Sequence, residues 1–202
     1  MKTSLLIAVL FAAGAAQTQN LKMIAVRFPA NGSTPNMIQF LCSQKYDRAE
    51  CVKDATALRH ATTPYPTQLL GAWSFVLVPA DDWKTLVLSQ GGDPVSPAFS
   101  MLEQRVTLLD SSLFSPSASR NKELLQRFSL MGSALVERVI THEMGHGICQ
   151  EKNERRADDY GKELREGKTP DCARPWTGKQ SSTQGVWRPR LQQVLDDRAC
   201  GR

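Results

Sequence analysis

The sequence predicts an α+β fold, a small domain with antiparallel strands in its first half and two packed helices in its second half. Runs of β-branched and apolar residues lie within residues 21–89, and helical periodicity dominates from residue 121 onward. Strands followed by helices are typical of the α+β class. A chain of 202 residues suits one domain.

The first residues are typical of an export signal. Lys2 provides the positive start, residues 5–14 form a short apolar run, and small residues follow it. This run is too short to remain as a membrane anchor. The sequence therefore predicts a signal peptide over residues 1–16, a single mature domain over 17–202, and a secreted or periplasmic location without membrane attachment after cleavage.

The charge pattern argues against nucleic acid as a partner. The full sequence has a formal net charge of +5, and loss of Lys2 with the signal leaves +4. The basic residues are scattered among Asp and Glu, whereas a nucleic-acid-binding surface needs a basic block or stripe.

Four segments in the first half are predicted strands. In chain order they are residues 21–28, 37–42, 72–78 and 83–89. The turn signal PADD joins the last two, so residues 72–89 are expected to form an antiparallel hairpin. Residues 91–97, rich in Gly and Pro, are predicted to form a loop.

Three segments are predicted helices. They are residues 121–148, 153–167 and 187–199. Gly132 is a weak point in the first of them. Asn153 is a plausible N-cap for the second, and Gly167 is expected to end it.

The five cysteines all lie in the predicted mature chain, where export favours disulfides. Cys42 and Cys51 could close a small loop. Cys149 and Cys172 stand at opposite ends of a predicted helix, so a bond between them would need a tight return segment. We therefore expect Cys172 to pair with Cys200, which leaves Cys149 free.

The stretch HEMGH carries the strongest functional signal. His142 and His146 are four residues apart, so both project from one face of a helix. Two imidazoles at this spacing can reach one Zn²⁺ ion at about 2.1 Å. Glu143 is then placed to take a proton from a zinc-activated water. On the opposite face the apolar residues are Val136, Ile140 and Met144.

The next predicted helix offers a third ligand. Glu154 and Asp158 share one face of it, and the longer side chain of Glu154 makes it the better candidate. Asp158 would then accept a hydrogen bond from the outer nitrogen of His142, as ligand histidines commonly require. A variant with Asp158 on the metal remains open. Ala157 is small, which favours close packing of the two helices.

These residues resemble a known family. HEMGH followed by NERRADDYG is similar to the gluzincin pattern of thermolysin-like zinc metallopeptidases, in which HExxH precedes a helix bearing N-E-x-x-[SA]-D. The resemblance implies the ligands His142, His146 and Glu154, the general base Glu143 and the outer partner Asp158. It covers about twenty residues, and only seven residues separate His146 from Glu154, far fewer than in thermolysin-like enzymes. The metzincin pattern is excluded because its third histidine is missing.

The resemblance also implies a zincin-like domain, in which an edge strand over the metal binds the substrate chain by strand addition. We place the hairpin at 72–89 in that sheet. The predicted function is hydrolysis of peptide bonds in a protein or peptide substrate. An exported, zinc-stabilised binding module without turnover is the alternative, and a disulfide-stapled protein without metal is a third possibility. His60 could stabilise an oxyanion but is more simply a surface residue, and Tyr160 is expected to face away from the metal.

Overall fold

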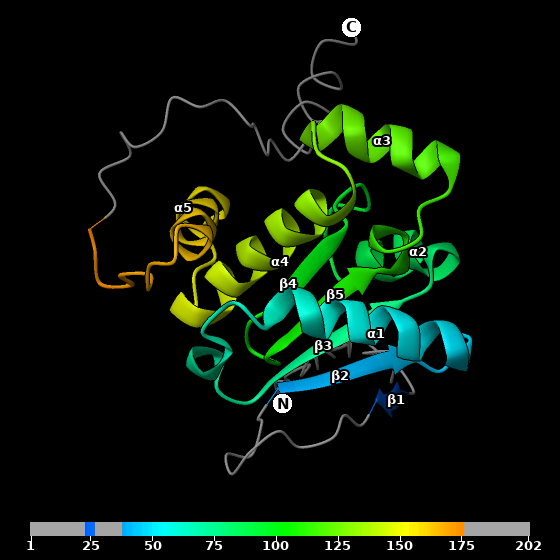
Figure 1. The fold of residues 1–202 in the computed structure, drawn as a ribbon, viewed down its shortest axis with the longest axis horizontal. Coiled ribbons are helices and arrows are strands. Elements are labelled where there is room, and N and C mark those ends of the chain that lie inside the picture. Colours follow the sequence, from blue (N-terminus) through cyan, green and yellow to red (C-terminus); the bar gives the residue numbers. More distant parts are fainter. Residues whose placement is uncertain (1–22, 27–37, 176–202) are drawn as a thin grey trace, which may run out of the picture.

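The computed structural model of the chain describes residues 23–26 and 38–175 (Figure 1). The predicted signal peptide at 1–16, the predicted helix at 187–199 and Cys200 lie outside these residues. The strands are β1 (Met23–Val26), β2 (Ile38–Ser43), β3 (Trp73–Val78), β4 (Ala98–Met101) and β5 (Val106–Asp110). The helices are α1 (Arg48–Thr62), α2 (Ala80–Ser89), α3 (Ala118–Phe128), α4 (Gly132–Cys149) and α5 (Glu154–Arg165), with short 3-10 turns at Thr67–Leu70 and Ser111–Leu113.

The five strands form one mixed sheet in the order β1-β2-β3-β5-β4. β2, β3 and β5 run parallel, while β1 and β4 are antiparallel to their neighbours. The α+β class is confirmed, but the purely antiparallel sheet is wrong for its centre. Among the described residues β4 lies at one edge of this sheet, and it contacts α4.

Helices cover both faces of the sheet, so there are two cores. On one face, α1 and α4 pack over the sheet and bury Phe75, Ile140 and Met144 (Figure 1). On the other face, α2 packs against Val76 and Leu108. The buried positions of Ile140 and Met144 confirm the predicted apolar face of the helix that carries His142 and His146. α4 is thereby fixed on the sheet, next to its β4 edge.

The predicted strand at 83–89 is wrong, because these residues belong to α2. Trp83, Leu86 and Val87 are its buried residues, which is a helical spacing. Asp81 and Asp82 lie in its first turn, where carboxylates stabilise a helix. The parallel strands that flank this segment also require a crossover, which a hairpin cannot provide.

Strands β4 and β5 had no counterpart in the prediction. β5 is apolar and almost entirely buried, and it can be mistaken for a short helical segment. β4 has only four residues and shows no clear alternation. The edge of the sheet beside α4 is therefore residues 98–101. Of the expected hairpin at 72–89, only Trp73–Val78 belongs to the sheet, as the interior strand β3.

The single predicted helix at 121–148 is two helices. Ser129 (φ 55°) ends α3 in the left-handed conformation, and Gly132 (φ 56°) begins α4. The expected weak point is thus a complete break. The N-cap prediction for α5 is confirmed, since the Asn153 side chain accepts hydrogen bonds from the backbone N–H groups of Arg155 and Arg156. None of the helices within 38–175 is long and apolar enough to cross a membrane.

Within residues 38–175 the disulfides are Cys42–Cys51 and Cys149–Cys172. The first agrees with the predicted small loop. The second contradicts the expected Cys172–Cys200 pair with a free Cys149. Gly167, with φ 74°, turns the chain after α5, and residues 168–171 are not helical. A non-helical segment can cover up to about 3.3 Å per residue, against about 1.5 Å in a helix, so a few residues can bring Cys172 back to Cys149.

Candidate metal centre

α4 and α5 lie unusually close together, and small residues permit this. A Cβ atom on Gly145 would be 2.6 Å from the backbone oxygen of Ala157, and one on Gly161 would be 2.9 Å from the backbone of Thr141 and His142. Ala157 is fully buried between the helices, as its size predicts. This close contact brings the first turn of α5 to the histidine face of α4.

Three side chains converge at this contact. The Nε2 atoms of His142 and His146 are 3.1 Å apart, and Oε2 of Glu154 lies 3.1 Å from the first and 3.6 Å from the second. Four ligands arranged tetrahedrally at about 2.05 Å from a zinc ion would lie about 3.3 Å from one another. The spacing, and the set of two imidazoles with one carboxylate, therefore match three corners of a zinc site.

The outer nitrogens of both rings fix their tautomers. Nδ1 of His142 is 3.0 Å from Oδ1 of Asp158, and Nδ1 of His146 is 2.5 Å from the backbone oxygen of Glu151. Carboxylate and carbonyl oxygens only accept, so each Nδ1 carries the proton. Each Nε2 then presents a lone pair toward the other and toward Glu154. Such an arrangement is unfavourable unless a cation, either a proton or a metal ion, lies among them.

The electrostatics of the cluster point the same way. Burial alone would lower the pKa of His142, but hydrogen bonds with Asp158 and Glu154 and the charge of Glu143 raise it to about 9. Burial opposes charge on His146 too, yet Glu154 and Glu143 raise its pKa. Burial would raise the pKa of Glu154, but hydrogen bonds from the two histidines hold it well below its usual range. The surrounding carboxylates thus stabilise positive charge at this point.

Asp158 supports the ring of His142 from the other side. Its Oδ1 also accepts a hydrogen bond from Arg138 of α4 at 2.8 Å. Since Asp158 binds Nδ1, it lies away from the point where the two Nε2 atoms meet. This arrangement favours Glu154 over Asp158 as the third ligand.

The link between α4 and α5 is held at Glu151. Its backbone N–H donates to the oxygen of His146 at 3.0 Å, in addition to the bond from Nδ1 of that residue to its own carbonyl. Its carboxylate accepts from the backbone of Asn153 at 2.8 Å and pairs with Arg156 at 3.0 Å. Gln150, with φ 50°, makes the sharp exit from α4. A link of four residues, 150–153, can therefore bring Glu154 to the histidines.

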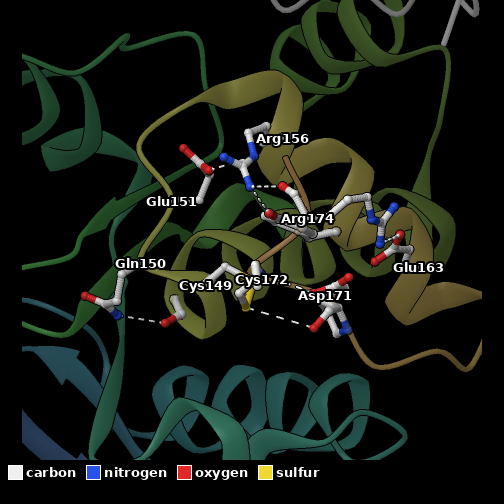
Figure 2. The surroundings of a disulfide bond; sticks show 12 residues. Cys149, Gln150, Glu151, Arg156, Glu163, Asp171, Cys172 and Arg174 are labelled. Atoms are coloured by element: carbon white, nitrogen blue, oxygen red, sulfur yellow. Dashed lines mark hydrogen bonds and ion pairs between the residues drawn. A yellow bond between two sulfur atoms is a disulfide. The ribbon is translucent and has the colours of Figure 1, made fainter. Parts of the chain in front are cut away.

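Residues 172–174, which follow α5 and are called the strap below, contact both the end of α4 and α5 (Figure 2). Cys172 is bonded to Cys149, the last residue of α4. Two residues later, the backbone oxygen of Arg174 accepts a hydrogen bond from Arg156 at 3.1 Å. The guanidinium of Arg174 pairs with Glu163 of α5. The same Arg156 side chain thus contacts both the strap and the link.

Glu143 faces the sheet. It is 4% exposed, and its Oε2 accepts a hydrogen bond of 2.6 Å from Ser100 on β4. Glu143, His146 and Glu154 line a cleft of about 500 Å³, together with residues of β4 and of the loop at 90–93. The predicted general base is therefore accessible from the same cleft as two of the three candidate ligands.

His60 and Tyr160 stand apart from this site. His60 is exposed near the end of α1 and does not line the cleft. Tyr160 is buried against α4, where its hydroxyl accepts a hydrogen bond from Arg156. The structure gives His60 no part in the site. Tyr160, which was expected to face away from the metal, packs against α4 at Gly145 and does not line the cleft.

Sequence reasoning missed Ser100, Glu151 and Arg156. Ser100 reaches Glu143 only through the pairing of β4 with β5, and β4 itself was not predicted. Glu151 acts on His146 through a backbone carbonyl, for which side-chain chemistry gives no signal. A sequence signal did exist for Arg156, which follows the N-cap by one helical turn and could reach back to the link.

No protein-family model matches the chain, and no curated protein or solved structure shows significant similarity to it.

Proposed function

We propose that this protein is an exported zinc-dependent metallopeptidase of the gluzincin type, with a zincin-like domain. The observation that carries the proposal is the convergence of the two Nε2 lone pairs and the Glu154 carboxylate at the spacing of a tetrahedral zinc site, beside the buried Glu143 and an open cleft. The two disulfides support an oxidising compartment, either secreted or periplasmic.

His142, His146 and Glu154 would hold the metal. Zinc bound there supplies Lewis acidity, which activates a water molecule and polarises the scissile carbonyl. Glu143 would take the proton from the attacking water and deliver it to the leaving amine nitrogen. Asp158 and the carbonyl of Glu151 would keep the two imidazoles in the ligand tautomer.

The substrate would be a peptide chain bound along β4. This strand is at the sheet edge, antiparallel to β5, and lines the cleft beside Glu143. An extended peptide could pair with its backbone, which would bring a scissile bond past the metal. Pairing at a sheet edge uses backbone hydrogen bonds, which do not distinguish one substrate sequence from another. Substrate selectivity would therefore come from side-chain pockets in the cleft.

The test combines metal content with activity. The purified mature chain should contain one zinc per molecule by mass spectrometry and cleave labelled casein, and chelation should abolish cleavage. Glu143→Gln should keep the zinc and lose at least about 10³-fold in kcat, because it cannot accept the proton.

Three outcomes separate the alternatives. A Glu143→Gln variant as active as the wild type would overturn the mechanism. Bound zinc without cleavage of any tested protein would favour a zinc-stabilised binding module. Absence of zinc after reconstitution, with full thermal stability in chelator, would leave a disulfide-stapled protein without metal.

A further inference from the structure

Behind Glu143 lies a chain of hydrogen bonds that crosses three strands. Trp73 on β3 donates its indole N–H to Oγ1 of Thr107 on β5 at 3.0 Å. Oγ1 of Thr107 lies 2.8 Å from Oγ of Ser100 on β4, and Ser100 donates to Oε2 of Glu143 at 2.6 Å. Ser100 and Thr107 are direct partners in the β4–β5 register, so their side chains share the face of the sheet that α4 covers.

The direction of this chain is fixed at both ends. An indole N–H can only donate, and a carboxylate can only accept. The single proton of the Ser100 hydroxyl is used on Glu143, so Ser100 must accept from Thr107. Thr107 in turn accepts from Trp73. Every donor in the chain therefore has one partner, and all of them point toward the carboxylate.

Burial strengthens this chain of hydrogen bonds. Trp73 is 2% exposed and Thr107 is 0% exposed, so water does not compete for these groups. Aligned hydrogen bonds in such surroundings polarise and strengthen one another. The indole nitrogen does not release its proton, so the chain anchors the carboxylate and is not a proton relay.

We propose that Ser100 is a positioning residue for Glu143, at the end of an anchor that begins at Trp73. This inference rests on the proposed function, in which Glu143 is the general base. Ser100 holds Oε2, while Oε1 accepts no hydrogen bond from the residues within 38–175, and Glu143 lines the cleft. One oxygen is therefore fixed to the sheet, and the other remains for the proton of the attacking water.

The hydrogen bond between Ser100 and Glu143 also fixes the position of α4 relative to the edge strand β4. β4 would bind the substrate and Ser100 is part of β4, so one strand fixes both the peptide and the base that acts on it. A shift of the strand would move both together. General-base catalysis depends on this relative placement, because the base must be within hydrogen-bond reach of the proton it removes.

The test compares Ser100→Ala, Ser100→Thr and Thr107→Val with the control Ser74→Ala. Ser74 is a half-buried strand serine whose hydroxyl does not bond to Glu143. Ser100→Ala should keep one zinc per chain and a melting temperature within a few degrees of the wild type, since the buried Thr107 hydroxyl loses only one partner. It should lose roughly 10- to 100-fold in kcat on labelled casein with KM unchanged. Ser100→Thr restores the hydroxyl and should recover most of kcat. Thr107→Val should fall between them.

Two results would overturn the inference: wild-type kcat in Ser100→Ala, or loss of zinc and stability in that variant, which would mean a structural role. A second measurement does not depend on activity. Crystal structures of the zinc-loaded wild type and Ser100→Ala should show one carboxylate orientation for Glu143 in the first and a turned or divided one in the second. Identical orientations would refute the anchor. If the wild type cleaves nothing, the proposed function fails, and these two structures still decide the role of Ser100.

Discussion

α5 and β4 lie on two sides of the candidate metal centre, and different interactions hold each of them against α4. α5 is tied to α4 by the Arg138–Asp158 ion pair and by close contacts at Gly145 and Gly161. The segments that flank α5 add the Cys149–Cys172 disulfide and the ion pair of Arg156 with Glu151. β4 is held by its pairing with β5 and by a chain of uncharged donors that ends at Glu143.

The difference follows from what each side has to do. Metal ligands must be kept within a few tenths of an ångström of their positions, so the α5 side needs strong restraint. The β4 side would receive a peptide, so its backbone must stay open at the sheet edge. Neutral donors suit it, because an added cation beside Glu143 would compete for the carboxylate that has to accept a proton.

The largest effect that separates the two sides is expected for Glu154→Ala. It removes a ligand, so zinc affinity should fall by more than 100-fold, beyond the usual cost of losing an outer hydrogen-bond partner. Ser100→Ala should leave that affinity unchanged. Competition with a chromophoric chelator measures both.

Glu166→Ala is the control for this comparison, because Glu166 is an exposed acidic residue at the end of α5 that pairs with Lys168. Its zinc affinity should equal that of the wild type. Equal affinities in Glu154→Ala and Glu166→Ala would show that Glu154 is not a ligand and would return Asp158 to consideration.

The second effect is expected from the disulfides. Replacing Cys149 and Cys172 together by Ser should cost about 2–4 kcal/mol in the free energy of unfolding and lower zinc affinity about 10-fold, since the link at Glu151 loses its strap. The matched pair is Cys42 and Cys51, which joins β2 to α1 away from the cluster.

Replacing Cys42 and Cys51 by Ser should lower the melting temperature and leave zinc affinity intact. Chemical denaturation and chelator competition on both double variants measure the two quantities separately. If both double variants lost zinc affinity equally, the loss would reflect general stability, and the α5 side would have no special restraint.

The same contrast explains what the sequence could predict. His142, His146 and Glu143 lie in one helix, whose geometry fixes their relative directions, so local spacing was enough. Glu154 and Asp158 could also be predicted, because a short link between two helices leaves few ways for them to pack. These are the parts of the α5 side that depend on contacts close in sequence.

The β4 side was not predictable in this way. Ser100 meets Glu143 43 positions away, through a strand pairing that no local pattern announces. The segment at 83–89 has strand-like composition but forms α2, because two parallel strands need a crossover. The Cys149–Cys172 bond depends on the turn of the chain after α5 and its return to the end of α4, which composition does not reveal.

The smallest effect is expected for Arg156→Ala. Arg156 acts on His146 at one remove, by holding the Glu151 side chain while the Glu151 carbonyl accepts from the imidazole. Zinc affinity should therefore fall by several-fold, less than about 10-fold, because the backbone link and the disulfide remain. The neighbouring Arg155→Ala, at an exposed position on the same helix, is the matched control and should change nothing. Chelator competition on the two variants measures the difference. Equal affinities would mean that the link holds its shape without the ion pair, and that the disulfide and the helix contact provide the restraint on the α5 side.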